Sequence, residues 1–162
     1  MLANELNHHW LFWAPLAAAL AHIFEEFAFP GGFVCWYRNY RGVKSSSITP
    51  RFLIIINAVL LAACVNVVTA AEEPAGVAYW IGISAVLASN GIWHAWAAVR
   101  SRSYSPGMVT GVLFYLPLAI YGCVHFLSSS TVSPATAVAA LLIGGSYPFW
   151  SAIFHASSKR TA

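Results

Sequence analysis

Residues 10–29 of the chain read WLFWAPLAAALAHIFEEFAF, a stretch that is apolar except for one histidine and two glutamates near its end. An apolar helix needs about 20 residues to cross the roughly 30 Å hydrocarbon layer of a bilayer, and this stretch has that length. No Lys or Arg precedes it in residues 1–9, whereas a secretory signal peptide begins with basic residues. The stretch therefore predicts a permanent membrane-spanning helix.

The composition of the whole chain agrees with a membrane protein. Of its 162 residues, 59% are hydrophobic and 8% are charged, and the mean hydropathy is +0.69. Soluble domains carry about 25% charged residues, and disordered chains are less hydrophobic than this one. Three widely spaced cysteines give no disulfide framework. These observations exclude a soluble fold, a disordered chain, a nucleic-acid-binding domain and a disulfide-stapled secreted module, so an integral membrane protein remains.

Apolar stretches of similar length recur along the sequence. Together with the first, the predicted spans are 10–29, 52–71, 77–99, 108–127 and 135–157. None of them alternates apolar and polar residues as membrane strands do. The loops between them are short, and no linker indicates a second domain. The sequence therefore predicts an all-α, polytopic membrane helix bundle with five transmembrane helices, which forms a single integral membrane domain over residues 1–162.

The cationic residues are confined to alternate loops. Arg38, Arg41, Lys44 and Arg51 lie between the first two spans, Arg100 and Arg102 between the third and fourth, and Lys159 and Arg160 after the fifth. The opposite ends of the spans contain no Lys or Arg. Because Lys and Arg in short loops are retained in the cytoplasm, this pattern predicts an N-terminus outside, a cytoplasmic C-terminus and a location in the inner, or cytoplasmic, cell membrane.

Two charged residues lie inside a predicted span. Glu25 and Glu26 belong to the first apolar stretch, and His22 precedes them by three and four residues. At 1.5 Å per residue, His22 lies about 10 Å and Glu26 about 4 to 5 Å from the cytoplasmic end of the helix. Residues three and four apart share one face of a helix, so the three side chains project together. A carboxylate costs about 2.5 to 3.5 kcal/mol at the centre of a membrane helix and less near an interface, so we expect polar partners.

Other predicted spans carry polar side chains at the same depth. By the helical rise, His94 lies about 9 Å from the cytoplasmic end of the third span, and Asn90 is one turn farther from that end. Asn57 in the second span and His155 in the fifth reach a similar layer. Tyr104, in the loop just below the third span, could cap this layer with a phenol. We therefore expect several helices to bring ligand-type groups to one place.

Two sequence motifs contain most of these residues. The first is HIFEE at 22–26, and the second is NGIWH at 90–94, followed after nine residues by YSPG at 104–107. They resemble the two motifs of the HXXEE family of integral membrane proteins, which are H-x-x-E-E and N-x-x-x-H followed by Y-x-P-G. The two motifs in this order are more specific than either one alone. The resemblance implies that the motif residues are important in this chain as they are in the family. It implies no particular reaction.

The residue types favour a metal site. Imidazole and carboxylate groups on facing helices form the metal sites of helix bundles, and they suit zinc or iron. In the leading hypothesis the motif histidines and one glutamate hold a divalent metal, while the other glutamate acts as a general base on a bound water. Asn90 could orient His94 or a substrate. The candidate metal ligands are His22, Glu25, Glu26, His94 and His155, and the candidate catalytic residues are Glu25, Glu26, Asn90 and Tyr104.

The expected function is that of a metal-dependent, hydrolase-like membrane enzyme. Its site lies near the cytoplasmic face, where a lipid or another hydrophobic substrate can enter from the bilayer. If both Glu25 and Glu26 are ligands, a second metal becomes possible, and a di-iron oxidoreductase acting on an alkyl chain is an alternative. The second alternative is a proton-coupled or ion-coupled transporter in which Glu25 or Glu26 gains and loses a proton. The third is a metal-free packing network or scaffold. The sequence leaves these alternatives open.

Overall fold

The fold is a bundle of antiparallel helices. The computed structural model describes residues 9–28, 31–41, 48–71 and 73–150, and helix is the only regular secondary structure within them. The elements are α2 (His9–Ala28), α3 (Gly32–Arg41), α4 (Pro50–Thr69), α5 (Gly76–Ser101), α6 (Met108–Thr110), the π-helix η2 (Gly111–Tyr115), α7 (Leu116–Ser128) and α8 (Pro134–Gly145). The predicted all-α class is confirmed.

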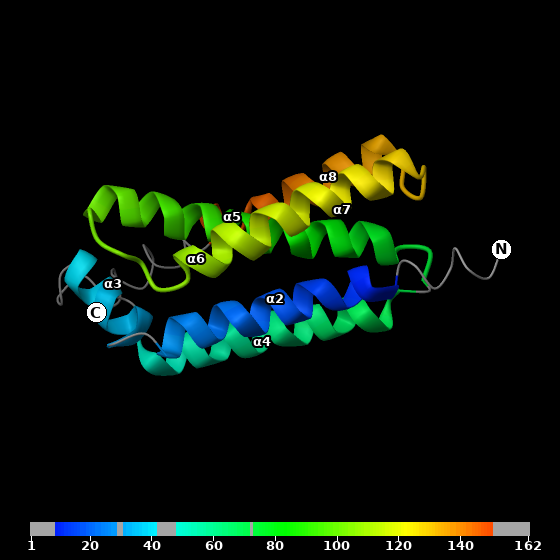
Figure 1. The fold of residues 1–162 in the computed structure, drawn as a ribbon. Helices are drawn as coiled ribbons and strands as arrows, with labels where there is room; N and C mark the ends of the chain where they lie inside the picture. The colour runs from blue at the N-terminus through cyan, green and yellow to red at the C-terminus, as the bar shows by residue number, and fades with distance from the viewer. Residues whose placement is uncertain (1–8, 29–30, 42–47, 72, 151–162) are drawn as a thin grey trace.

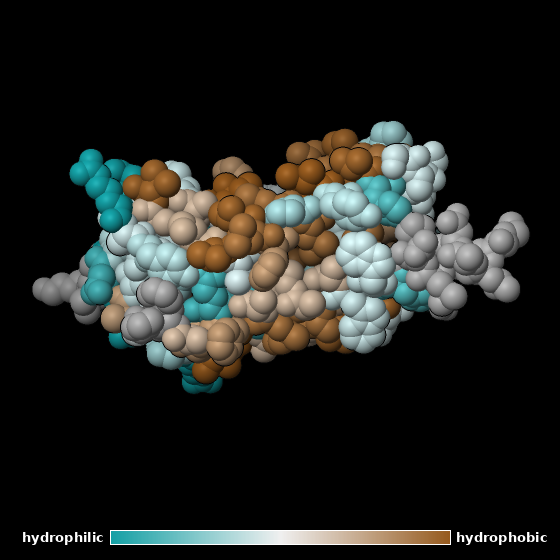
Figure 2. Space-filling model, viewed as in Figure 1, coloured by the Kyte–Doolittle hydropathy of each residue, from teal (hydrophilic) through white to brown (hydrophobic). Residues whose placement is uncertain are grey.

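Four helical segments are long and apolar enough to cross a membrane. They are His9–Ala28, Pro50–Thr69, Gly76–Ser101 and Met108–Ser128, and they match the first four predicted spans to within two residues at each end. Figure 2 shows hydrophobic residues predominating over the middle of the molecule, with more hydrophilic residues toward both ends. This distribution is the one that a bilayer requires of a membrane protein.

The fifth predicted span is only partly described. Its helix, α8, begins at Pro134 and ends at Gly145, and a turn at Ser146 separates it from the helical residues 147–150. The twelve residues of α8 are fewer than the roughly 20 that a span needs. The rest of the predicted span, from 151 onward, lies outside the described residues. A count of five spans therefore stays a prediction.

Hydroxyl side chains begin two of the helices. The side chain of Thr49 accepts a hydrogen bond from the amide of Phe52 at the start of α4, and Ser133 does the same for Thr136 at the start of α8. A proline follows each capping residue, where its missing N–H costs no helical hydrogen bond. Both starts follow directly from the local sequence.

The helices alternate in direction, so their ends gather at two poles. In Figure 1, α2 lies beside α4 on one side of the bundle, α5 and α8 pack together on the other, and α3 lies at one end. That end holds the five arginines of the described residues, Arg38, Arg41, Arg51, Arg100 and Arg102. The expected grouping of the cations at one pole holds for these five.

A buried tryptophan anchors the core at the opposite pole. Trp80 is fully buried among Leu11, Phe12, Ile81 and Phe126, and its indole N–H donates a 2.7 Å hydrogen bond to the carbonyl of Leu11. This carbonyl lacks its usual helical donor because the residue four positions later is Pro15, which has no N–H. The indole therefore satisfies a polar group that the proline leaves open.

A π-helical turn and two glycines bring α5 close to the fourth span. The π-helix η2 ends two residues before Pro117, whose missing N–H removes one hydrogen bond of the helix at this point. Beside it, a Cβ added to Gly91 would lie 2.8 Å from the carbonyl oxygen of Gly111, so only a glycine permits this backbone contact. The contact packs the start of the fourth span against α5, beside the helical turn that carries Asn90 and His94.

Candidate functional site

Two histidines and one glutamate meet in the interior near the arginine-rich pole. Oε1 of Glu26 lies 3.7 Å from Nε2 of His22 and 3.5 Å from Nε2 of His94. The exposed fractions of His22, Glu26 and His94 are 1%, 4% and 1%, so all three side chains are shielded from solvent and lipid. His22 and Glu26 are one turn apart on α2, and His94 comes from α5. The site therefore joins both sequence motifs.

Hydroxyl groups lie within hydrogen-bond distance of the ring nitrogen of each histidine that faces away from Glu26. Nδ1 of His22 lies 3.0 Å from Oγ1 of Thr110, and Nδ1 of His94 lies 3.1 Å from Oγ of Ser105. With Nδ1 of each ring bonded to a hydroxyl, Nε2 of each ring is the nitrogen that faces Glu26. Partners of this kind at the remote nitrogen orient histidines that bind metals.

Two asparagines complete the polar interior. Nδ2 of Asn57, on α4, donates a 2.9 Å hydrogen bond to Oε2 of Glu26. Nδ2 of Asn90, on α5, lies 3.1 Å from Nε2 of His22, where the amide can donate to an unprotonated ring nitrogen. Asn57 thus fixes the carboxylate from one side, and Asn90 lies against Nε2 of His22.

Glu25 lies beside this centre with its own set of partners. Oε1 of Glu25 accepts hydrogen bonds from the phenol of Tyr104 and the amide of Val109, and Oε2 accepts from the amide and the hydroxyl of Thr110. The two amides belong to the start of α6, where free N–H groups attract an anion. Each carboxylate oxygen therefore has two donors, which stabilise this charge although no Lys or Arg of the described residues forms a salt bridge with it.

The bond to Glu25 also affects Tyr104. Partial burial and the neighbouring carboxylate raise the pKa of the Tyr104 phenol above its usual range. The phenol therefore stays protonated and continues to donate to Glu25 over the physiological pH range. Tyr104 lies in the loop that joins α5 to α6, and it connects this loop to α2.

The same loop covers the two histidines. Gly107 has a φ of 97°, and a Cβ added there would lie 2.7 Å from Cε1 of His22 and 2.9 Å from Cε1 of His94. A side chain at this position would collide with both rings and would strain the backbone. The YSPG segment at 104–107 therefore acts through three residues, because Tyr104 binds Glu25, Ser105 binds His94 and Gly107 allows the chain to pass over the imidazoles.

Aromatic rings enclose the rest of the site. The ring of Tyr115, on η2, lies 4.6 Å from that of His22 between centroids, and the ring of Phe33, on α3, lies 5.1 Å from that of His94. Phe33 and Tyr37 are buried on the face of α3 that contacts Trp93. The short helix α3 thus closes the pole above the polar centre and excludes water from it.

The donor set fits a metal ion. In the described part of the chain, no Lys or Arg forms a salt bridge with Glu26, whose close polar neighbours are the two imidazoles and the amide of Asn57. The candidate ligand atoms of His22, Glu26 and His94 all lie within 4.8 Å of one another. A tetrahedral metal with bonds of about 2.0 to 2.2 Å separates neighbouring ligand atoms by about 3.3 to 3.6 Å, which is close to the distances of 3.7 and 3.5 Å between Oε1 of Glu26 and the two Nε2 atoms. A cation, either a metal or a proton on an imidazole, can sit among these three groups.

The structure brings together most of the predicted site residues. His22, Glu26, His94 and Asn90 share one centre, and Glu25 and Tyr104 form a pair beside it. His155 lies outside the described residues, so its predicted role as a further ligand stays a prediction. Sequence reasoning assigned no role to Ser105, Gly107 and Thr110. A hydroxyl in the motif loop and another in the first turn of the next helix were the available signals.

Comparison with known proteins gives one match. A family model described as a protein of unknown function with HXXEE motif matches residues 13–122, about two-thirds of the chain. No curated protein and no solved structure matches the chain. The matched range contains α2 from Trp13 onward, α3, α4, α5 and the loop over the imidazoles, and thus every residue of the centre described above. The chain belongs to the HXXEE family.

Proposed function

We propose that the protein is a metal-dependent membrane enzyme of the hydrolase type. His22, Glu26 and His94 would hold one divalent metal, zinc or iron, near the cytoplasmic face. The observation that carries this proposal is the convergence of two Nε2 atoms on one buried carboxylate oxygen, with both Nδ1 atoms already bonded to hydroxyls. Polar side chains that only stabilise helix packing do not need to direct two Nε2 atoms at one carboxylate oxygen.

Three protein ligands leave a position for a reactant. Metal sites that catalyse hydrolysis commonly have three protein ligands and one open position, and two histidines with one glutamate are a known set. When bound, such a metal supplies Lewis acidity toward a water molecule or a substrate oxygen. Asn90, beside Nε2 of His22, is placed to hold a substrate oxygen or that water. Because both oxygens of Glu25 already accept two hydrogen bonds, Glu25 holds the loop and Glu26 is the carboxylate at the centre.

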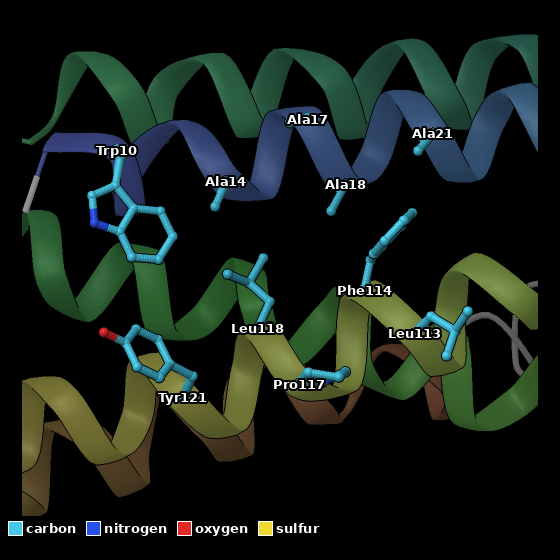
Figure 3. Close-up of a pocket in the computed structure, with 10 residues that line it drawn as sticks. All are labelled: Trp10, Ala14, Ala17, Ala18, Ala21, Leu113, Phe114, Pro117, Leu118 and Tyr121. Atoms are coloured by element: carbon cyan, nitrogen blue, oxygen red, sulfur yellow. The ribbon is translucent and has the colours of Figure 1, made fainter.

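An apolar groove supports a lipid or another hydrophobic substrate. It has a volume of about 500 Å³ and runs along the bundle between α2 and the η2–α7 segment (Figure 3). The lining residues are Trp10, Ala14, Ala17, Ala18, Ala21, Leu113, Phe114, Pro117, Leu118 and Tyr121. They carry no charge, and their only polar atoms are the indole nitrogen and the phenol oxygen at the end where Trp10 and Tyr121 face each other (Figure 3). An alkyl chain suits such a lining, because the small alanine side chains leave space without offering polar partners.

The groove leads toward the polar centre. Ala18 lies one helical turn before His22 on α2, and Ala21 is its direct neighbour in the chain. On the opposite wall, Phe114 directly precedes Tyr115, whose ring lies 4.6 Å from that of His22 between centroids. An alkyl chain in the groove would therefore direct its head end toward the centre, and we propose that the substrate enters laterally from the bilayer.

The remaining topology is also proposed. The arginines at the pole that carries α3 favour a cytoplasmic location for this pole, with the N-terminus outside, the C-terminus in the cytoplasm and the protein in the inner, or cytoplasmic, membrane. Five spans require that the helix following Ser146 continue across the bilayer. Accessibility of tags at both termini tests the orientation, and a cytoplasmic N-terminus would contradict it.

A second enzyme class uses the same ligands. Two histidines and one carboxylate are also the ligand set of non-haem iron oxygenases, so an oxidoreductase acting on an alkyl chain is the second candidate. A centre with two metals has less support, because Glu25 is occupied by other donors. A transporter also has less support. Between the centre and the opposite pole, no His, Asp, Glu, Lys or Arg side chain is buried among the described residues.

Elemental analysis of the purified protein, prepared without chelators, tests the proposal. We expect about one zinc or iron per chain in the native protein and its loss from Glu26→Gln and His94→Gln. His125→Ala, at the opposite pole, is the matched control and should retain the metal. Zinc would favour the hydrolase and iron the oxidoreductase. A metal-free native protein, or a metal retained by both site variants, would contradict the proposal.

A further inference from the structure

We propose that Thr110 is a positioning residue that keeps the proton of His22 on Nδ1 and thereby presents the lone pair of Nε2 to the centre. Thr110 lies outside both sequence motifs, in the first turn of the fourth span. The effect of Thr110 on metal affinity rests on the proposed function, whereas its effect on the tautomer of His22 does not. The two can therefore be tested separately.

The argument begins with the single proton of the Thr110 hydroxyl. Oγ1 of Thr110 has two close partners, Oε2 of Glu25 and Nδ1 of His22, the latter at 3.0 Å. A carboxylate oxygen only accepts, so the hydroxyl must donate to Glu25. The carbonyl of Gly107, at 3.5 Å, is a more distant and uncharged competitor. Because its one proton is directed at Glu25, Thr110 can only accept from His22, and Nδ1 of His22 must carry a proton.

The backbone makes this arrangement rigid. The amide of Thr110 donates a 2.8 Å hydrogen bond to the same Oε2 of Glu25, and the amide of Val109 donates to Oε1 at 3.1 Å. These two backbone hydrogen bonds fix Glu25 beside the hydroxyl of Thr110, so the hydroxyl keeps the same acceptor rather than rotating freely. On the other side of the ring, the amide of Asn90 lies 3.1 Å from Nε2, which is the arrangement expected when Nε2 bears no proton.

The two glutamates of the motif consequently act on opposite sides of one imidazole. Glu26 lies 3.7 Å from Nε2 of His22, and Glu25 reaches Nδ1 through the hydroxyl of Thr110. Carboxylates that act on the remote nitrogen of a histidine orient the ring and increase its basicity as a ligand. In this protein Glu25 acts on Nδ1 of His22 through the hydroxyl of Thr110, whereas Glu26 faces Nε2 directly. The two adjacent glutamates of α2 therefore have different roles.

Nitrogen NMR of histidine tests the proposal on the metal-free, full-length protein in micelles. Three proteins are compared, the native chain, Thr110→Val and Thr110→Ser, and the His22 signals are identified by their loss in His22→Gln. We expect the Nδ1–H tautomer in the native chain and in the serine variant, which retains the hydroxyl. In the valine variant, which has nearly the same shape, we expect this tautomer to be lost or mixed. Unchanged His94 signals in Thr110→Val show that the fold is retained.

Metal affinity is the second readout. Titration with zinc should give binding about 10- to 100-fold weaker for Thr110→Val than for the native chain, with recovery in Thr110→Ser. A native His22 tautomer in Thr110→Val, or the Nε2–H form in the native chain, would overturn the role of Thr110 even if metal binds normally. If the native chain binds no zinc or iron, the proposed function fails, while the tautomers still decide the role of Thr110.

Discussion

Asn57 donates a 2.9 Å hydrogen bond to Glu26 from a helix that carries neither sequence motif. We expect Asn57→Leu to lower the free energy of unfolding by about 1 to 3 kcal/mol, because a buried carboxylate loses a donor that nothing replaces. Thermal or denaturant unfolding in micelles measures this change. Asn66→Leu, at an exposed position of the same helix, is the control and should change stability by less than about 0.5 kcal/mol. Equal effects of the two variants would show that the bond to Glu26 contributes no stability.

Gly107 should tolerate no side chain. A Cβ there meets the rings of His22 and His94 at less than 3 Å, and the backbone has a φ of 97°. We expect Gly107→Ala to cost about 1 to 3 kcal/mol of stability and to weaken any metal binding, because both rings must move. Gly145→Ala is the control, since an added Cβ there meets nothing within 4 Å. A native melting temperature for Gly107→Ala would contradict the close passage of the loop over the rings.

Trp80 and Pro15 should be coupled in stability. Trp80→Phe removes the donor to the carbonyl of Leu11, which Pro15 leaves without a helical partner. Pro15→Ala supplies an N–H that can bond this carbonyl. We therefore expect Trp80→Phe to cost about 1 kcal/mol less in the Pro15→Ala background than in the native chain. A double-mutant cycle of unfolding measures this difference, and strict additivity would show that the indole bond is not compensating for the proline.

The bond between Tyr104 and Glu25 should depend on pH only under alkaline conditions. Burial and the neighbouring carboxylate raise the pKa of Tyr104 in the folded protein above the value of about 10 in unfolded chains. Its contribution is therefore fully present below about pH 10 and is lost as the pH rises through the raised pKa. We expect Tyr104→Phe to cost about 1 kcal/mol at neutral pH, and less as the pH rises above 10.

Unfolding of the native chain and of Tyr104→Phe over a pH series checks this prediction. The difference between the two proteins should be constant from neutral pH to about pH 10 and should then shrink. A difference that stays constant as the pH rises above 10 would mean that the pKa of Tyr104 is not raised in the folded protein.

Much of the centre could be predicted from the sequence because helices have a fixed rise. Counting residues from the basic ends of the spans placed His22, Asn90, His94 and Asn57 at one depth, and the structure brings these four side chains to one centre. The helix boundaries were equally predictable, since apolar stretches of span length are long signals with little ambiguity.

The distinct roles of Glu25 and Glu26 could not be predicted in the same way. Both lie on α2 at nearly the same depth. Helical periodicity predicts the direction in which each side chain points, but it does not predict which residue of another helix that side chain contacts. Their roles depend on which helices pack on either side. Thr110 comes from the start of the fourth span, and Asn57 comes from α4. Such lateral neighbours are determined by packing, and no local pattern in this sequence indicates them.

The interruption within the last predicted span was also beyond a hydropathy argument. Residues from Pro134 onward are apolar enough to suggest one continuous helix, yet α8 ends at Gly145 and a turn follows at Ser146. Pro148 lies just after this turn, and a proline cannot donate to the preceding helical turn. Hydropathy measures average composition, whereas a single proline and its neighbours decide where a helix is interrupted.

The loop between α5 and α6 should not accept inserted residues, and this limits where a further domain can be fused into the chain. Residues 102–107 must reach Glu25, His94 and the face of His22 together, so even one inserted residue would move at least one of these contacts out of register. The turn at 129–133, at the other pole, is held by hydrogen bonds among near neighbours such as Ser129 and Thr131. Epitopes, fluorescent domains or rigid fiducials for electron microscopy therefore belong in the turn at 129–133, where they would leave the centre intact.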